Sequence, residues 1–335
     1  MHMADALLSP AVGATMWAVT AGAIACCAKK VKDDLDDRKV PLMGVMGAFV
    51  FAVQMINFTI PGTGSSGHLG GGMLLAILLG PAAALITMAS VLTVQALFFA
   101  DGGLLALGST IFNLGALPCF VAYPLIYRKI AGVAPSRRRI LVGSLLAAVA
   151  GLQLGAFGVV LETTLSEISE LPLGTFALLM QPIHLAIGVV EGLVTAAVVT
   201  FVWQARPEVL ATAVRPGGSG SWRGVLTALA VATVLTAGCL SWFASAHPDG
   251  LEWAVSRVTG SEELAEPEGD IHSALAGLQA RTSVFPDYGF WTQETEQEPA
   301  SADAGTSVAG LVGGLLTLLL AGLAGLLLKK RPRSP

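Results

Sequence analysis

The sequence predicts an all-α, polytopic transmembrane helical bundle. Hydrophobic residues make up 54% of the 335 residues and charged residues only 13%, whereas about a quarter of the residues in soluble globular proteins are charged. Apolar runs recur along the chain, and about 20 apolar residues in a helix cross roughly 30 Å of hydrocarbon. We therefore expect a multi-pass protein in contact with membrane lipid, with about seven spans followed by two further C-terminal spans.

The expected spans are apolar runs bounded by charged residues, Pro or Gly. They fall at residues 10–28, 41–60, 68–79, 82–99, 104–127, 139–160, 175–205, 223–245 and 307–328. The third run is short and ends at Gly80-Pro81. We expect it to be either a half-span that turns back or a tilted helix that shares a buried corner with the next run.

The distribution of positive charge predicts the orientation, because Lys and Arg are enriched in short loops on the cytoplasmic side. With Met1 outside, 17 of the 19 Lys and Arg residues fall in predicted inner segments, and only Arg257 and Arg281 do not. The inner segments are 29–39, 128–139, 206–223 and 329–335. We expect the N-terminus outside the cell and the C-terminus in the cytoplasm.

A linker divides the chain into two parts. Residues 206–222 contain two prolines and a Gly-Gly-Ser-Gly-Ser run, which is typical of a connecting segment. This predicts a membrane domain at 1–205, a cytoplasmic linker, and a two-span domain at 223–335. The last two spans enclose an outer acidic loop, 246–306, which contains twelve Asp and Glu residues and two Arg residues. Part of that loop, HPDGLEWAVSRV at 247–258, is expected to be ordered.

The first two residues can bind a metal ion. With histidine in second position, the α-amine of Met1, the deprotonated amide of His2 and the His2 imidazole form fused chelate rings in one plane. Planar nitrogen donors suit Ni(II) or Cu(II), whereas zinc prefers a tetrahedron. The alternative is an ordinary N-terminal histidine. The segment PGTGSSGHLGGG at 61–72 is predicted on the same outer face, so His68 is a candidate fourth ligand, and the glycines would let another segment approach closely.

Two ionisable residues occupy the middle of the predicted span 175–205. His184 and Glu191 are seven residues apart and therefore share one helical face, and such residues usually face a bundle interior. They are either pathway groups or a polar pair that supports the helices, and we favour support. A different class of function, an intramembrane metalloenzyme using this pair, lacks an HExxH motif and has at most two ligands. Asn57 could likewise contact the N-terminal segment or only a neighbouring helix.

Small residues recur every four positions on the first span, at Ala14, Ala18 and Gly22. Such a stripe lets another helix approach closely. It predicts either packing inside the bundle or contact with a separate membrane protein.

Three segments resemble one protein family, the CbiM/NikM substrate-binding (S) components of energy-coupling-factor nickel and cobalt transporters. They are MHMADALLSP at 1–10, SSGHLGGG at 65–72 and PIHLAIGVVEGLVTA at 182–196. PDGLE at 248–252 resembles the two-span PDGLE/NikN-like domain often fused to nickel members. The resemblance implies a square-planar ion held by the Met1 amine, the His2 amide and imidazole, and the His68 imidazole.

The resemblance also implies a substrate-capturing transport subunit and not an enzyme. It implies partners, namely a transmembrane coupling (T) subunit and cytoplasmic ABC-type ATPase subunits. The ATPase must be a separate subunit because no ATPase motif occurs in this sequence. Gly62 and Gly67 have P-loop spacing, but His68 follows where a nucleotide site needs Lys. The expected cargo is Ni²⁺, with Co²⁺ for cobalamin synthesis as the alternative. A metal sensor or storage protein is a further alternative. We expect a bacterial inner-membrane protein with no nucleic-acid partner.

Overall fold

The structure, a computed structural model, is a bundle of long helices with one small strand pair, which confirms the predicted all-α class. It describes residues 1–34, 39–132, 134–210, 223–262, 264–265, 269–290 and 304–328. The helices are α1 Pro10–Asp34, α2 Lys39–Gln54, α3 Gly72–Leu79, α4 Pro81–Phe99, α5 Leu107–Ile111, α6 Arg128–Ala131, α7 Arg137–Ser166, α8 Leu173–Ala205, α9 Pro207–Leu210, α10 Arg223–Gly238, α11 Gly250–Thr259, α12 Asp270–Thr282 and α13 Ala304–Leu328.

Six helical stretches in the described part of the chain are long and apolar enough to cross a membrane. They are Pro10–Asp33, Pro81–Phe99, Leu107–Ala131, Arg137–Ser166, Leu173–Ala205 and Ala304–Leu328. The third of these joins α5 to α6 through two π-helical segments, Phe112–Ala116 and Pro118–Tyr127. Two shorter apolar helices, α2 and α10, have 16 residues each.

The expected third span is a half-span. Helix α3 has eight residues and is therefore about 12 Å long, less than half of the hydrocarbon thickness. It ends where Gly80 adopts a φ of +84° and Pro81 begins α4. The positive φ turns the chain sharply, and glycine adopts it without steric cost. Helix α4 therefore packs back against α3, as the half-span alternative predicts.

The second expected span is shorter than its apolar run, and its predicted end at residue 60 is wrong. Helix α2 stops at Gln54, and Phe58–Ile60 forms strand β1, which pairs with antiparallel β2, Ser65–Gly67. Gly62 and Gly64 have φ values of +78° and +76°, which the intervening turn requires. Apolar side chains alone do not distinguish a helix end from a buried strand. Helix α10 likewise ends at Gly238 and not at residue 245.

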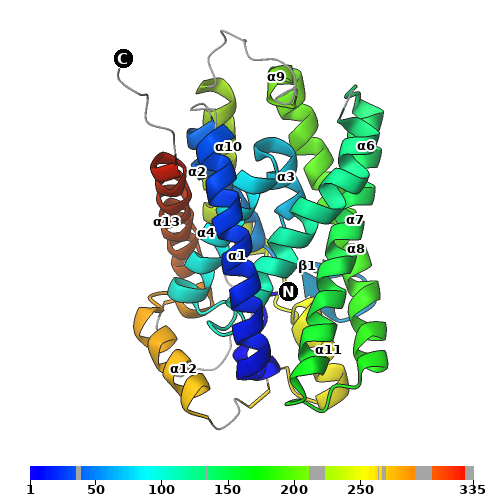
Figure 1. Cartoon of the computed structure of the whole chain (residues 1–335), viewed down its shortest axis with the longest axis vertical. Coiled ribbons are helices and arrows are strands. Elements are labelled where there is room, and N and C mark those ends of the chain that lie inside the picture. Colours follow the sequence, from blue (N-terminus) through cyan, green and yellow to red (C-terminus); the bar gives the residue numbers. More distant parts are fainter. Residues whose placement is uncertain are drawn as a thin grey trace.

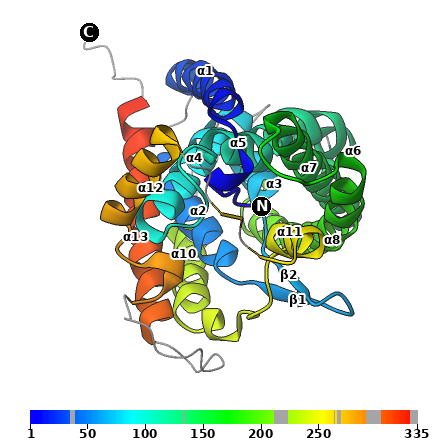
Figure 2. The same cartoon turned by 90° about the horizontal axis from the view of Figure 1, so that it is seen from below.

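The helices that adjoin the predicted inner segments, which are rich in Lys and Arg, lie at one end of the bundle. Helices α6 and α9 lie at that end, and α11 and α12 lie at the opposite end (Figure 1). Seen from below, α7 and α8 form one side, α10 and α13 lie on the other, and the N-terminus is between them (Figure 2). Most of the predicted linker, residues 211–222, and the basic tail 329–335 lie outside the described residues.

The small-residue stripe on α1 faces away from the bundle. Ala14, Ala18 and Gly22 are all exposed, so of the two alternatives for this stripe, packing inside the bundle is not the one that the structure shows. The bundle is contacted by another face of the helix, where the Thr20 hydroxyl donates to the carbonyl of Gly108 at 2.8 Å. Residues four apart stay on one face, which keeps the stripe together on the surface.

Candidate metal-binding site

The N-terminal peptide is fixed inside the protein by the loop before α5. Gly103 donates its backbone N–H to the Met3 carbonyl at 2.8 Å, and the Asp5 carboxylate accepts from the Ala106 N–H at 2.9 Å. Met1 and Met3 are buried. A Cβ at Gly103 would lie 2.5 Å from the Asp5 nitrogen, so the two segments are in backbone contact. This packing places the first two residues within the bundle.

The glycine-rich loop places His68 directly after strand β2. Its backbone is held on one side by α8, because the Glu191 carboxylate accepts from the Gly70 N–H at 2.7 Å. On the other side, the Gln54 amide donates to the Gly70 carbonyl at 2.8 Å. A Cβ at Gly67 would lie 2.5 Å from Cδ1 of Ile187. The loop therefore needs glycine there to lie against α8, as the sequence predicted for a close approach.

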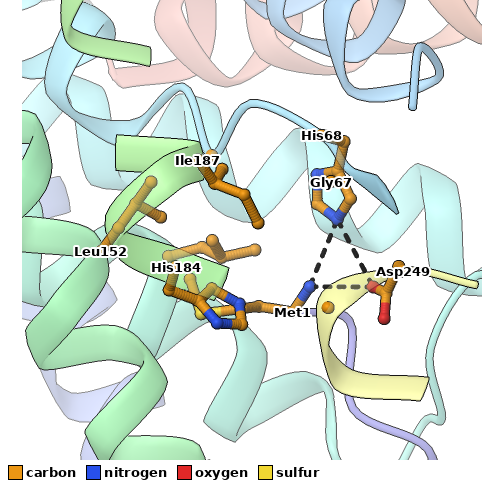
Figure 3. Close-up of a pocket in the computed structure, with 10 residues that line it drawn as sticks. Met1, Gly67, His68, Leu152, His184, Ile187 and Asp249 are labelled. Carbon is orange, nitrogen blue, oxygen red and sulfur yellow. Dashed lines mark hydrogen bonds and ion pairs between the residues drawn. The ribbon is translucent and has the colours of Figure 1, made fainter. Parts of the chain in front are cut away.

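The α-amine of Met1 meets the His68 ring. The Met1 nitrogen is 3.2 Å from His68 Nε2 and donates to Asp249 Oδ2, also at 3.2 Å. His68 Nε2 and Asp249 Oδ2 are 3.9 Å apart. These three residues form the triangle of dashed lines in Figure 3. Two nitrogens bound to one ion at about 2 Å each are about 3 Å apart when they are neighbours in the plane, so the amine and His68 have the spacing of adjacent ligands.

The His2 ring lies beside His68. The two rings are stacked, with centroids 4.9 Å apart and planes 18° apart. Nδ1 of His2 is 3.1 Å from Asp101 Oδ1, whereas its Nε2 is buried without a hydrogen-bond partner. Burial, together with the positive charge of the amine, lowers the pKa of both His2 and His68 to about 3. Both imidazoles are therefore neutral at neutral pH, which is the form that binds metals.

Asp249 was not singled out in the sequence, although it lies against the amine. It is the N-cap of α11: its Oδ1 accepts from the Leu251 and Glu252 N–H groups at 2.7 and 2.9 Å, and the Glu252 side chain accepts from the Asp249 N–H. Burial alone would raise the pKa of Asp249, but the amine charge and these N–H groups hold it well below its usual range. The D-x-x-E spacing indicates this capping box, but nothing in the sequence links it to Met1.

The residues expected in supporting roles lie in different places. His184 lines the cavity beside Met1 and Ile187 (Figure 3), and its Nδ1 is 2.8 Å from the Met180 carbonyl. Glu191 contacts the backbone of the glycine-rich loop. The backbone carbonyl of Asn57 accepts from the Ser245 N–H at 2.7 Å. This hydrogen bond joins Asn57 to the C-terminal part of the chain and not to the N-terminal segment.

Side chains alone do not form a metal site in the described ranges. No group of three or more His, Cys, Asp or Glu side chains there is close enough to hold an ion. A metal site at His2 and His68 consequently needs backbone nitrogens as donors. His272 is buried, with Nε2 3.0 Å from the Leu8 carbonyl.

Comparison with known proteins identifies the family. The family described as "CbiM: Cobalt uptake substrate-specific transmembrane region" matches residues 2–209, and the PDGLE domain family matches residues 223–330. The chain belongs to the CbiM family. The match covers more than half of the chain, and a PDGLE domain follows it. The resemblance of the three segments to the CbiM/NikM family, and of PDGLE at 248–252 to the PDGLE domain, is therefore confirmed.

Relatives of this CbiM protein are named for the transport of two metals. A fused nickel transport protein, NikMN, from Rhodobacter capsulatus is 29% identical and aligns over 86% of this chain and 88% of its own length. A cobalt transport protein, CbiM, from Geobacter sulfurreducens is 32% identical and aligns over 87% of this chain and 89% of its own length. The crystal structure of a transition metal transporter is 31% identical, has a TM-score of 0.55, and aligns over 65% of this chain and all of its own.

The family and the fold together define the coarse function. This CbiM protein is a nickel or cobalt transport protein of the membrane, with several apolar spans, and it is not an enzyme. The alternative of an intramembrane metalloenzyme is thereby wrong. In physical terms, His184 and Glu191 bond to backbone atoms of separate segments and do not form a shared centre.

Proposed function

We propose that the chain captures a divalent ion with four nitrogens: the Met1 amine, the His2 amide, the His2 imidazole and the His68 imidazole. The observation that carries this proposal is the buried approach of the Met1 nitrogen to His68 Nε2, at 3.2 Å. Buried polar groups of one chain rarely meet at such a distance without a hydrogen bond or a shared ligand. In the metal-free protein the amine and the imidazole share a proton, and a metal ion would replace it.

Closing the planar site requires one movement. Only Nδ1 of His2 is near enough to the backbone to form a chelate ring with the His2 amide, and in this structure Nδ1 faces Asp101 at 3.1 Å. The imidazole therefore exchanges the carboxylate for the ion, by rotating about its side-chain bonds. Tyr288, whose hydroxyl donates to Asp101, would retain the carboxylate in place after the exchange.

Nickel is the cargo that the donor set favours. A planar set of four nitrogens suits Ni(II), and the fused PDGLE domain matches the arrangement of relatives named as fused nickel transport proteins. Cobalt is the alternative because other relatives are named cobalt transport proteins. Copper would bind a planar nitrogen site more tightly still, so binding strength alone does not identify the physiological ion.

We infer that the site opens to the outer face and that the α6 end of the bundle faces the cytoplasm. Lys29 and Lys30 lie in the last turns of α1, and Arg128 and Lys129 begin α6. Their positions at the α6 end follow the positive-inside rule. On this basis Met1 and the α11 segment belong to the outer half of the protein.

We infer that ATP hydrolysis is supplied by partner subunits of the energy-coupling-factor class. No ATPase motif occurs in the sequence. The exposed small-residue stripe of α1, at Ala14, Ala18 and Gly22, offers a flat helical surface for a transmembrane coupling subunit. Replacing Ala18 with Leu should weaken that complex and leave metal binding intact.

The remaining polar residues support the site. Glu191 holds the loop that carries His68 through Gly70, and His184 lines the cavity beside Met1. Asn57 ties the end of α2 to Ser245. We also infer two domains, 1–205 and 223–335, joined by 206–222, since the first family match ends within that linker, at residue 209, and the second begins directly after it, at residue 223.

Metal uptake by cells tests the function. Cells that make the chain together with coupling and ATPase subunits should accumulate ⁶³Ni, and cells that make the chain alone should not. Replacing His68 with Ala should remove uptake at unchanged protein level. If cells that make the chain alone accumulated nickel in an amount equal to the amount of the protein, the result would indicate storage and not transport.

A further inference from the structure

The segment between α10 and α13 reaches back to the N-terminal peptide and its neighbours at three points. The contacts are Asp249 to the Met1 amine at 3.2 Å, His272 to the Leu8 carbonyl at 3.0 Å, and the Tyr288 hydroxyl to Asp101 beside His2. The partners come from positions more than 180 residues apart in sequence. The C-terminal part of the chain therefore forms one wall of the metal-binding site.

The two oxygens of Asp249 make different contacts. Oδ1 caps α11 by accepting from the Leu251 and Glu252 N–H groups. Oδ2 is left to accept from the Met1 amine at 3.2 Å. The first set of bonds fixes the direction in which the second oxygen points, because a carboxylate is planar. The helix cap thus orients the acceptor for the amine.

The same segment is fastened to the hairpin that carries His68. Ser66 donates its N–H to the Pro248 carbonyl at 2.8 Å, and its hydroxyl donates to the His247 carbonyl at 2.7 Å. The Trp253 indole donates to the Thr63 carbonyl at 3.0 Å. Asp249 is therefore held at a fixed position relative to His68. Through Asp249, the Met1 amine is held at a fixed position relative to His68 as well.

The start of α11 also has no room to shift toward α8. A Cβ at Gly250 would lie 2.6 Å from Cγ2 of Ile183 and 3.2 Å from Cε1 of His184. Glycine at this position lets the helix start lie directly on α8. The position of Asp249 is thus set by the hairpin on one side and by α8 on the other.

We propose that Asp249 is a positioning residue that holds the α-amine of Met1 beside His68, so that the PDGLE segment contributes directly to metal capture. This inference rests on the proposed function of the amine as a ligand. Asp249 itself is not a ligand, because the four nitrogens fill a planar site and the carboxylate remains outside it as the hydrogen-bond acceptor of the amine. An amine bound to nickel keeps two N–H groups, so it can still donate to Asp249.

The test compares Asp249→Asn with Glu252→Ala in the full-length, metal-free protein. Asparagine keeps an oxygen that can cap α11 but replaces the charged acceptor of the amine. Glu252→Ala removes half of the capping box and leaves the carboxylate of Asp249. The first readout is the rate at which an amine-selective acylating reagent modifies Met1, measured by mass spectrometry. The second is nickel affinity together with the visible spectrum at saturation.

We expect Asp249→Asn to raise the acylation rate of Met1 by about tenfold, because the amine loses a hydrogen bond to a charged acceptor. It should also lower nickel affinity by about tenfold, because the ion must then immobilise an amine that is no longer held beside His68. The planar spectrum at saturating nickel should be unchanged, and Glu252→Ala should resemble the wild type in both readouts. Acylation of Asp249→Asn at the wild-type rate would overturn the proposal. So would an equal increase in Glu252→Ala, which would assign the effect to the helix and not to the carboxylate.

The spectrum separates positioning from ligation. If Asp249→Asn changed the ligand field at saturation, Asp249 would be a ligand and the proposal would be wrong. Acylation is measured without metal, so its outcome does not depend on nickel binding. If the wild-type protein bound no nickel through Met1, the proposed function would fail, while the acylation rates would still report whether Asp249 holds the amine.

Discussion

The α-amino nitrogen of Met1 lies 3.2 Å from Nε2 of His68, and both residues are buried. Two segments bring them together: the N-terminal peptide, held by the loop before α5, and the glycine-rich loop, held by Glu191. Burial removes competing water from both nitrogens. The pair therefore offers a metal ion two adjacent ligands at a distance that needs little adjustment.

An N-terminal extension should abolish nickel binding. Four residues left before Met1 by a cleaved tag would convert the buried amine into an amide, which removes one ligand and one chelate ring. A single added residue would not serve, because a histidine in third position forms a planar nitrogen site of its own. The added residues would also have to fit among Met1, His68 and Asp249. Equilibrium binding to the purified protein measures the loss.

The control for this prediction is the same extension followed by a protease site that restores Met1 as the first residue. Cleavage should restore binding to the wild-type level. Normal binding before cleavage would show that the amine is not a ligand.

Gly103→Ala should displace the N-terminal peptide. The added Cβ would lie 2.5 Å from the Asp5 nitrogen, a distance that requires backbone movement. Gly174→Ala is a matched control, because a Cβ there has no neighbour within 4 Å. We expect Gly103→Ala to lower nickel affinity by more than about tenfold and Gly174→Ala to leave it unchanged, as measured by titration. Equal affinities would contradict the placement of the peptide.

Glu191→Ala should destabilise the loop that carries His68. It leaves the buried Gly70 N–H without its acceptor, which costs about 1–3 kcal/mol. Glu191→Gln keeps an acceptor oxygen and should cost less. Thermal unfolding in detergent, with and without nickel, measures both effects. If the two variants lost the same stability, the hydrogen bond to Gly70 would not be the cause.

Nickel affinity should increase as pH rises from about 6 to about 8, because the Met1 amine and the His2 amide must each lose a proton to bind the ion. The imidazoles should not contribute in this range, since burial lowers the pKa of His2 and His68 to about 3 and both are already neutral. Calorimetry in buffers of different ionisation enthalpy counts the protons released. A value near zero would contradict coordination through the two backbone nitrogens.

The long helices could be predicted from the sequence, and the joins between them could not. Apolar runs located α4, α7, α8 and α13, because bilayer thickness sets the length of such helices. The run at 41–60 contains the end of α2 at Gln54 and the strand β1, which pairs with β2 across the turn at Gly62 and Gly64. Hydrophobicity does not report this change from helix to strand. Hydrophobicity also does not tell whether the stripe of small residues on α1 faces the bundle interior or its surface.

Much of the candidate site followed from local chemistry. The donors of Met1 and His2 are adjacent in sequence, and His68 stands in a glycine-rich segment that sequence reasoning placed on the same face. Asp249 was not predicted, because its contact with Met1 depends on how α11 packs on α8. Only the folded chain shows that relationship, at a separation of 248 residues.

The most direct measurement is nickel binding by purified protein with a native Met1, beside His2→Ala and His68→Ala, with the ligand field read from the visible spectrum. We expect one ion per chain with a square-planar spectrum in the wild type, lost in both variants. Tight binding that survives both substitutions would contradict capture by the N-terminus and would direct attention to His184, Glu191 and the histidines between α10 and α13.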